Sequence, residues 1–183
     1  MSRICLMASV LLAGIFFEAT AQEKLKKQKI GEEITMKVPV SFIPMNDDDM
    51  WQRVASTRKA LALYTDLDRL VELGVNRSYS VWREGDYQMM FDVYKASILE
   101  LFDEVEFIKE DIISVKKRPF VVFEFVSRIK RDEGSSVPVV KYNYLKYTLQ
   151  DGQTLVFSFS CPEFEQDKWQ STANAIMNSV VIK

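Results

Sequence analysis

Apolar and polar residues alternate in two long runs between Lys141 and Cys161, and this pattern predicts two antiparallel strands. Asp151-Gly152 lies between the runs and is a preferred two-residue hairpin turn, because both of its positions accept positive φ. The turn fixes the facing pairs, which are Gln150 with Gln153, Thr148 with Leu155, Lys146 with Phe157, Tyr144 with Phe159 and Tyr142 with Cys161. One face of the hairpin is strongly apolar and the other is mixed, so we expect other elements to cover both.

Two further stretches show the three- and four-residue spacing of amphipathic helices. The longer follows Asp86, which we expect to cap its first turn, and the shorter follows Pro162. The apolar positions of the longer stretch are Tyr87, Met90, Phe91, Tyr94, Ile98, Leu101, Phe102 and Val105. Those of the shorter stretch are Trp169, Ala173, Ile176, Met177 and Val180. Each helix is expected to cover the sheet, and Asn46 is expected to start a third, short helix that buries Trp51 and Val54.

The remaining β patterns are shorter. Residues from Ile34 to Val38 alternate between apolar and polar, and Pro39 and Pro44 bracket a predicted edge strand. Further strands are expected at 61–64, at 70–81 with a bulge at Gly74, in short pieces of 106–115 and, as a central strand, at 120–126. Because hairpins rather than helices join most strands, the expected fold class is α+β, a mainly antiparallel sheet covered by helices on both faces.

The N-terminal residues predict export. Arg3 precedes an apolar run from Ile4 to Phe17, and Ala19-Thr20-Ala21 supplies the small residues of a signal-peptide cleavage site. The expected division is 1–21 signal peptide, 22–32 flexible lead-in and 33–183 single α+β domain. The mature chain would be periplasmic or extracellular and would have no membrane span. Cys161 is then its one cysteine, so no internal disulfide is expected.

Together these features resemble a known fold. The exported N-terminus, Val38-Pro39 followed by Phe42-Ile43-Pro44, the long helix, and the closing hairpin with the helix from Trp169 to Val180 are similar to the PsbP-like α/β/α sandwich. The chain also resembles small secreted proteins of uncharacterised function from Gram-negative bacteria. The resemblance covers most of residues 33–183. It implies an accessory protein that docks onto a larger partner, and it brings no set of catalytic residues.

Composition excludes several kinds of chemistry. The 183 residues include no histidine, which excludes Ser-His-Asp and Cys-His mechanisms and histidine-ligated zinc within this chain. A mature chain with one cysteine cannot form a cysteine-cluster metal site. The six glycines form no phosphate-binding loop, and a net charge of −2 does not suggest a nucleic-acid-binding protein. We therefore expect no cofactor and no nucleic-acid partner.

Carboxylates remain as a source of catalysis. The candidate acids are Glu72, Glu124 and the group Glu163, Glu165 and Asp167. Such acids could supply a general acid and base, as glycosidases use, so a carboxylate-dependent hydrolase is the alternative function. Glu124 is the first to consider, because an acid in an apolar strand could have a raised pKa, although glutamates there more often pair with Lys or Arg. The adjacent aspartates 47–49 would point about 100° apart on a helix, so no metal site is expected there.

The tryptophans give the candidate binding residues. Trp51 and Trp169 lie on apolar helix faces and are expected in the core. Trp82 is adjacent to Arg83 at a strand-to-helix junction, where binding residues tend to be exposed, and packing is the alternative role for this tryptophan. Because an aromatic residue beside an arginine is typical of interface hot spots, we predict that Trp82 and Arg83 bind a partner. The sequence favours an exported, non-enzymatic binding or accessory module whose partner is a protein or a cell-envelope component.

Overall fold

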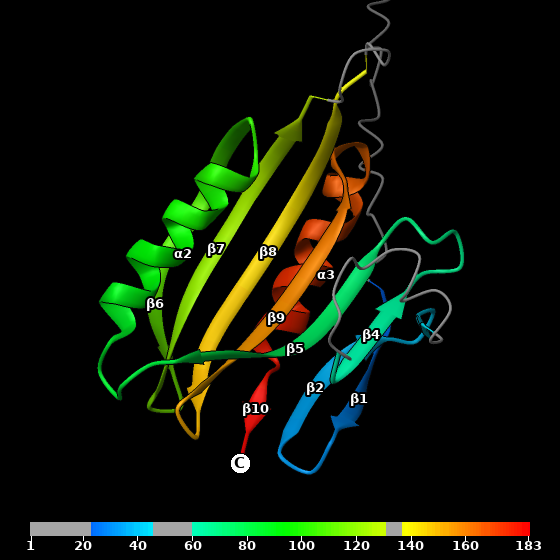
Figure 1. The fold of residues 1–183 in the computed structure, drawn as a ribbon. Helices are drawn as coiled ribbons and strands as arrows, with labels where there is room; N and C mark the ends of the chain where they lie inside the picture. Colours follow the sequence, from blue (N-terminus) through cyan, green and yellow to red (C-terminus); the bar gives the residue numbers. More distant parts are fainter. Residues whose placement is uncertain (1–22, 46–59, 131–136) are drawn as a thin grey trace, which may run out of the picture.

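The computed structural model describes residues 23–45, 60–130 and 137–183 (Figure 1). The predicted signal peptide lies outside these ranges, as does the short helix expected after Asn46 with its aspartates. Two antiparallel sheets and two α-helices form the described part of the chain, and neither helix is long and apolar enough to cross a membrane.

The larger sheet has seven strands. In spatial order they are β3 (Ile43–Pro44), β4 (Ala62–Thr65), β5 (Glu72–Val81), β9 (Gln153–Pro162), β8 (Val139–Gln150), β7 (Arg118–Ile129) and β6 (Glu104–Val115). The smaller sheet has the order β1 (Leu25–Ile30), β2 (Ile34–Pro39) and β10 (Val181–Ile182). The helices are α2 (Tyr87–Leu101) and α3 (Gln166–Asn178), and a single turn, η1 (Glu163–Glu165), precedes α3. All the pairs are antiparallel, so a mainly antiparallel sheet is confirmed.

The hairpin of β8 and β9 occupies the middle of the larger sheet. Asp151 and Gly152 have φ angles of 52° and 74°, the left-handed conformation that the predicted turn requires. The predicted pairs are all present, from Gln150 with Gln153 at the turn to Tyr142 with Cys161 at the far end. The register prediction is therefore confirmed. The apolar face of the hairpin, with Phe157, Phe159 and Cys161, is fully buried.

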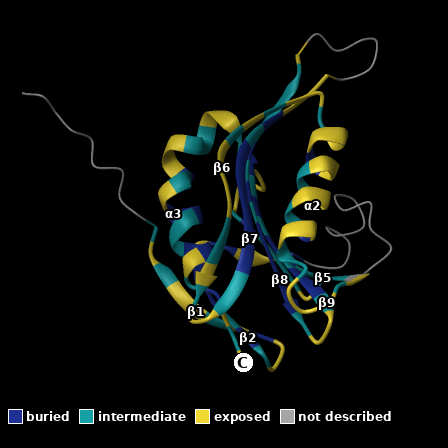
Figure 2. Cartoon of the chain, turned by 90° about the vertical axis from the view of Figure 1, so that its left-hand side faces the viewer, coloured by how far each residue is buried: buried dark blue, intermediate teal, exposed yellow. Residues whose placement is uncertain are grey.

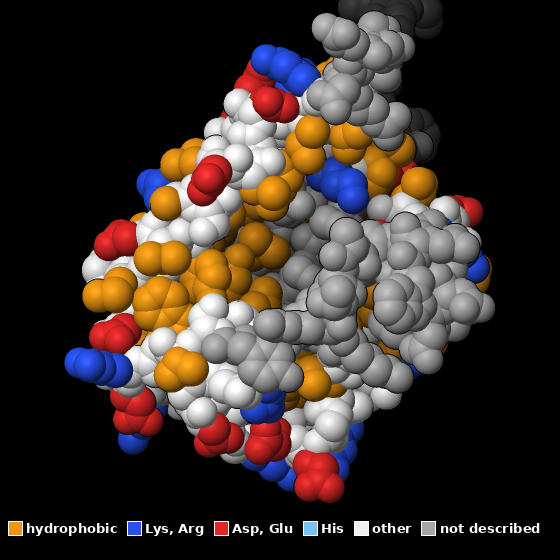
Figure 3. Space-filling model, viewed as in Figure 1, with side chains coloured by type: hydrophobic (Ala, Val, Ile, Leu, Met, Phe, Trp, Pro, Cys, Tyr) orange, Lys and Arg blue, Asp and Glu red, His pale blue; other side chains and the backbone are white. Residues whose placement is uncertain are grey.

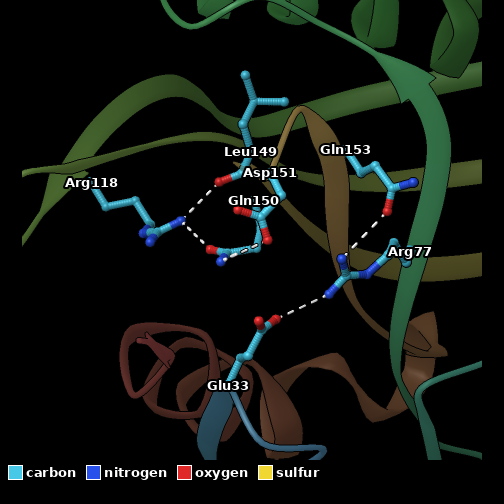
Figure 4. Close-up of polar contacts among 7 residues, drawn as sticks. All are labelled: Glu33, Arg77, Arg118, Leu149, Gln150, Asp151 and Gln153. Atoms are coloured by element: carbon cyan, nitrogen blue, oxygen red, sulfur yellow. Dashed lines mark hydrogen bonds and ion pairs between the residues drawn. The ribbon is translucent and has the colours of Figure 1, made fainter.

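Arg118 holds the turn end of this hairpin (Figure 4). Its Nη1 donates hydrogen bonds to the carbonyl oxygen of Leu149 at 2.8 Å and to Oε1 of Gln150 at 2.9 Å. Arg118 is the first residue of β7 and is half-buried. Lys116 and Lys117 form the turn before it, with φ angles of 52° and 69°.

A second arginine joins the two sheets at the same end (Figure 4). Arg77 of β5 places Nη2 3.2 Å from Oε2 of Glu33, in the turn before β2. Its Nη1 donates a hydrogen bond to Oε1 of Gln153 at 3.4 Å. Since both partners of this ion pair are partly exposed, it contributes less to stability than to the relative placement of the sheets.

The two faces of the larger sheet pack against different helices, which lie on opposite sides of it in Figure 2. Strand β7 shows the reason. Phe120 and Val122 belong to the core beneath α3, whereas Val121, Phe123 and Phe125 belong to the core beneath α2. Side chains alternate between the faces of a strand, so a strand buried on both faces is apolar throughout, as the sequence of β7 indicated.

The core beneath α3 also includes the smaller sheet. The predicted apolar face of this helix is buried, with Trp169, Ala173, Ile176 and Met177. Ile34, Met36 and Val38 of β2 are buried in the same cluster. Trp169 therefore lies in the core, as predicted, and the alternation in β2 reflects its contact with α3.

The expected flexible lead-in is corrected, because residues 25–30 form strand β1. This strand pairs with β2 along its whole length, from Leu25 opposite Pro39 to Ile30 opposite Ile34. In β1, Ile30 alone is fully buried. Main-chain hydrogen bonds at the sheet edge hold β1, and such bonds leave no periodic pattern of apolar side chains in the sequence.

Three other strand expectations also change. Residues 40–41 are a turn, and the edge strand is reduced to the two residues Ile43 and Pro44. The expected short pieces at 106–115 are one continuous strand, β6, with an irregularity between Phe107 and Lys109. The expected central strand, β7, lies next to the edge strand β6, and β9 is the middle strand.

Gly74 does not mark a bulge, because the irregularity of β5 lies between Ser78 and Val81. Gly74 instead pairs with Ser158 of β9. A Cβ at position 74 would lie 2.6 Å from the Ser158 Oγ, closer than real contacts allow. A larger residue at position 74 would therefore force the Ser158 side chain to move.

Candidate functional site

Helix α2 carries apolar residues on two opposite faces. Its inner face buries Met90 and Ile98 against the sheet. Its outer face presents Met89 and Val93, which are 57% and 44% exposed, and the exposed Ala96. These three residues recur at four- and three-residue steps and so lie on one side of the helix. Figure 3 shows hydrophobic side chains gathered over this part of the molecule.

The predicted binding residues lie at the start of the same helix. Trp82 is half-buried, with its ring 6.2 Å from the ring of Tyr94, and its indole N–H is buried without an acceptor among the described residues. Arg83 is exposed, and its backbone N–H donates to Oδ2 of Asp86 at 3.0 Å. Asp86 therefore stands at the expected cap position, but its carboxylate accepts from Arg83 and not from the helix. Trp82 and Arg83 precede the helix, and Trp82 packs on its inner side against Tyr94. Much of the Trp82 side chain therefore serves packing, which was its alternative predicted role. We call Met89, Val93 and Ala96 the α2 surface.

Acidic side chains flank the α2 surface. Glu84, Asp92 and Glu100 are exposed, and Arg83 is the exposed cation beside them. Lys95 lies on the neighbouring side of the helix, and its Nζ is 2.8 Å from Oε2 of Glu110 on β6. The surface is thus apolar along its middle and mainly negative at its margins.

A depression of about 310 Å³ lies between the larger sheet and the start of α3. It is lined by Glu106, Ile108, Val126, Arg128, Val140, Glu163 and Gln166. The guanidinium Nε of Arg128 lies 3.1 Å from Glu104, so one acid already neutralises this cation. The volume is at the lower limit of small-molecule sites.

A buried carboxylate lies close to this depression. Glu124 is 4% exposed, and its Oε1 accepts hydrogen bonds from the hydroxyl of Tyr142 at 2.9 Å and from Nε2 of Gln170 at 2.7 Å. Gln170 in turn accepts a long, 3.5 Å bond from Gln166, which lines the depression. Burial, with the nearby charge of Glu124, raises the pKa of Tyr142. Tyr142 therefore stays protonated and donates to the carboxylate.

The other candidate acids are dispersed. Glu163 lines the depression, while Glu165 accepts from Lys168 at 3.0 Å and from the indole N–H of Trp169 at 3.2 Å. Asp167 is exposed in the first turn of α3. Glu72 pairs with Ser160 and therefore lies on the opposite face of the sheet from Glu124. Glu165 thus supports packing of the helix, and Glu72 is separated from Glu124 by the sheet itself.

Lys146 is the unexpected buried charge. It is fully buried on β8, and its Nζ donates a 2.9 Å hydrogen bond to the carbonyl oxygen of Met177, near the end of α3. The ammonium also lies 4.2 Å from the ring centre of Phe120. Burial lowers the pKa of Lys146 to about 8. This lysine ties the hairpin to the carboxyl end of α3, where a cation is favoured by the helix dipole.

Sequence reasoning missed the outer face of α2 and the partners of Glu124. Met89, Val93 and Ala96 follow helical spacing, so a second apolar stripe was detectable in the sequence. Gln170 gave no such signal, because a glutamine on a helix surface is ordinary. Its contact with Glu124 spans 46 positions and depends on how α3 crosses the sheet.

No protein-family model matches this sequence, and neither does any curated protein. Solved structures do match the fold. The solution structure of cyanobacterial PsbP (CyanoP) from Synechocystis sp. PCC 6803 has a TM-score of 0.57 and 16% identity, covering 97% of this chain and 99% of that chain. The fold is PsbP-like.

Two further structures share it. The Ran-binding protein Mog1p from Saccharomyces cerevisiae has a TM-score of 0.56 and 13% identity, covering 87% of this chain and 96% of that chain. LpqN, involved in cell envelope biogenesis of Mycobacterium tuberculosis, has a TM-score of 0.53 and 9% identity, covering 87% and 91%. The predicted resemblance to the PsbP-like fold is confirmed, and at these identities the likeness concerns the fold alone.

Proposed function

We propose that this chain is an exported, non-enzymatic accessory module that docks onto a protein of the cell envelope through the α2 surface. In this proposal the domain is a PsbP-like sandwich in which α3 closes the main core and α2 presents its outer face to the partner. One observation carries the proposal. Met89 and Val93 leave apolar surface exposed on the side of α2 that faces away from the sheet. A helix that is apolar on both sides normally has both sides covered.

The charges around this surface indicate the kind of partner. With Glu84, Asp92 and Glu100 at the margins, a complementary surface would be apolar in the middle and basic at its rim. Arg83 would meet an acidic group or a main-chain carbonyl.

Solved proteins with this fold are consistent with docking. Mog1p is described as a Ran-binding protein, and LpqN as a protein involved in cell envelope biogenesis. The signal-peptide pattern supports export into the periplasm or beyond. A mass spectrum of the exported protein tests this part, with cleavage after Ala21 as the expected result. Recovery of a membrane-bound product that retains residues 1–21 would contradict it.

The hydrolase alternative receives little support from the geometry. Glu124 is held by two internal hydrogen bonds, and the contacts of the described residues do not pair it with another of the candidate acids. A pair of catalytic carboxylates has to face one cleft across the scissile bond. A hydrolytic activity that Glu124→Gln abolishes would replace the docking proposal with this alternative.

Site-specific photocrosslinking tests the docking surface. A photoreactive residue at Val93 should form a crosslink to a single partner in the native envelope, and the same residue at Leu67, exposed in the turn between β4 and β5, should not. Met89→Glu combined with Val93→Glu should abolish the crosslinked complex without changing the unfolding free energy by more than about 0.5 kcal/mol, since both positions are on the surface.

The predicted pair is tested in the same assay. Trp82→Ala with Arg83→Ala should reduce complex formation, and Leu67→Glu serves as the matched control on another exposed apolar residue. Equal crosslinking from Val93 and Leu67, or a complex that survives all these variants, would contradict docking through the α2 surface.

A further inference from the structure

The smaller sheet presents a lysine-rich face. In the pairing of β1 with β2, Lys27 lies directly opposite Lys37, and Lys29 lies opposite Thr35. Residues two apart on a strand share a face, so these three lysines project from the same side. The other side of β2 carries Ile34 and Met36, which are buried beneath α3. The lysines therefore point away from the core, and all three are exposed. We call Lys27, Lys29 and Lys37 the lysine face.

The lysine face has no ion-pair partner among the residues that the structure describes. None of its three ammonium groups forms an ion pair with another residue in the ranges 23–45, 60–130 and 137–183. Lys24 and Lys26 are also exposed, but Lys26 pairs with the buried Val38 and so lies on the other side of β1 from the lysine face. Like charges directly opposite each other in a sheet are unfavourable, so the pair of Lys27 with Lys37 lowers stability. A chain with a net charge of −2 thus concentrates positive charge in one place.

Protection of a sheet edge explains only part of this arrangement. Lysines on an edge strand prevent pairing with other chains, and β1 is an edge strand. Lys37 is on the inner strand β2. Strand β10 pairs only with Ile34 and Thr35 there, but a side chain already accepts the N–H of Lys37, the Oγ of Ser179 at 2.7 Å. Its charge is therefore not needed for that purpose.

We propose that the lysine face binds the surface of a membrane that contains anionic phospholipids. Each lysine close to such a surface contributes to attraction without needing an acid at a fixed position. The outward side of a three-stranded sheet lets several ammonium groups reach a planar surface together. Val181 of β10 pairs with Thr35, so it shares this face, and it is 37% exposed. An apolar residue among lysines suits the boundary between headgroups and acyl chains.

Two other partners fit these residues less well. Protein interfaces are depleted in lysine and use Trp, Tyr and Arg as anchors, none of which occurs among the residues of β1, β2 and β10. Single-stranded nucleic acids are bound by stacking on aromatic side chains, which these strands also lack. The inference is independent of the α2 surface, which belongs to a different part of the chain.

Vesicle co-flotation of the exported, full-length mature protein tests the proposal. Binding is expected to vesicles that mix phosphatidylglycerol with phosphatidylcholine, not to vesicles of phosphatidylcholine alone, and it should weaken as salt rises. Lys27→Gln with Lys37→Gln should weaken binding roughly 30-fold, since each lysine contributes about one kcal/mol. Lys116 and Lys117 are an exposed lysine pair in the turn between β6 and β7. Lys116→Gln with Lys117→Gln should change vesicle binding less than about threefold.

The alternatives give different results. Equal binding to both kinds of vesicle, or an equal loss in both lysine pairs, would contradict the proposal. So would unchanged vesicle binding by Lys27→Gln/Lys37→Gln. Circular dichroism checks that this variant folds, and removal of the like-charge pair should leave its stability equal or higher. A variant that keeps its binding to vesicles but loses its binding to a soluble acidic protein would assign the lysine face to a protein partner.

Discussion

The hydroxyl of Tyr142 donates a 2.9 Å hydrogen bond to the carboxylate of Glu124, and both side chains are buried, at 0% and 4% exposure. The two residues lie on neighbouring strands, β8 and β7, on the side of the sheet that faces α3. Gln170 supplies a second donor to the same carboxylate. These two hydrogen bonds explain how Glu124 is kept inside an apolar strand without an ion pair.

This arrangement predicts a loss of stability when Tyr142 becomes Phe. The variant leaves Glu124 with one donor, and a hydrogen bond to a charged group contributes about 1.5 to 3 kcal/mol. Denaturant unfolding should show a loss in that range. Tyr144→Phe is the matched control, because no hydrogen bond joins the Tyr144 hydroxyl to the described residues, and it should change stability by less than about 0.5 kcal/mol. Equal effects of the two variants would contradict the structural role of the bond.

Lys146 predicts a pH dependence that Lys146→Met should remove. Its pKa is lowered from 10.5 to about 8 in the folded protein, so between these values the unfolded chain binds more protons. Stability contributed by this residue therefore rises with pH from about 8 to 10.5, because the cost of burying the charge disappears. The unfolding free energy of the wild type, measured relative to Lys146→Met, should increase across that window by on the order of 3 kcal/mol.

The buried tyrosines and the cysteine lose protons more readily in the unfolded chain, which lowers stability above about pH 9. Because this contribution is common to both proteins, it cancels in the difference between wild type and Lys146→Met. A difference that stays constant from pH 7 to about 11 would contradict the assignment to Lys146.

Cys161 should be unreactive in the native protein. Its side chain is fully buried, and burial raises the pKa of its thiol to about 12, assisted by the charge of Glu165. The thiolate is the reactive form, so a thiol reagent should label the folded protein slowly and the protein in guanidinium quickly. Rapid labelling under native conditions, or a disulfide-linked dimer, would contradict this prediction.

Trp82→Phe should leave stability unchanged or raise it by about 1 kcal/mol, because it removes a buried N–H that has no acceptor among the described residues. Trp169→Phe is the contrasting variant, since its indole N–H donates to Glu165 at 3.2 Å. Urea titration of both variants should show a loss of stability for Trp169→Phe. A larger loss at Trp82 than at Trp169 would show that the Trp82 indole N–H has a partner.

Local chemistry made much of the sheet predictable. The Asp151-Gly152 turn sets the register of β8 and β9 by itself, because two residues with positive φ leave one way to pair the flanking strands. The buried faces of α2 and α3 follow from spacing alone, as does the burial of β7 on both sides. In each case the information lies within about 20 consecutive residues.

The candidate sites were less predictable, because their contacts join residues that are far apart in the sequence. Trp82 and Arg83 were identified from their neighbourhood in the sequence, but the extent to which Tyr94 covers Trp82 depends on where α2 crosses the sheet. Glu124 was recognised as an unusual acid, while its donors come from positions 18 and 46 residues away.

By itself, then, the sequence determined the antiparallel hairpin, the two amphipathic helices and the exclusion of histidine chemistry, because turn geometry, side-chain periodicity and composition are local properties. The tertiary structure alone decided that Lys27 faces Lys37 and that Lys146 reaches the carbonyl of Met177. Strand β1 is held by main-chain hydrogen bonds, for which every residue except proline has an N–H donor. Lys146 is buried by contact with a helix residue 31 positions away. Such contacts depend on which surfaces meet when the chain closes, and no periodicity in the sequence records that choice.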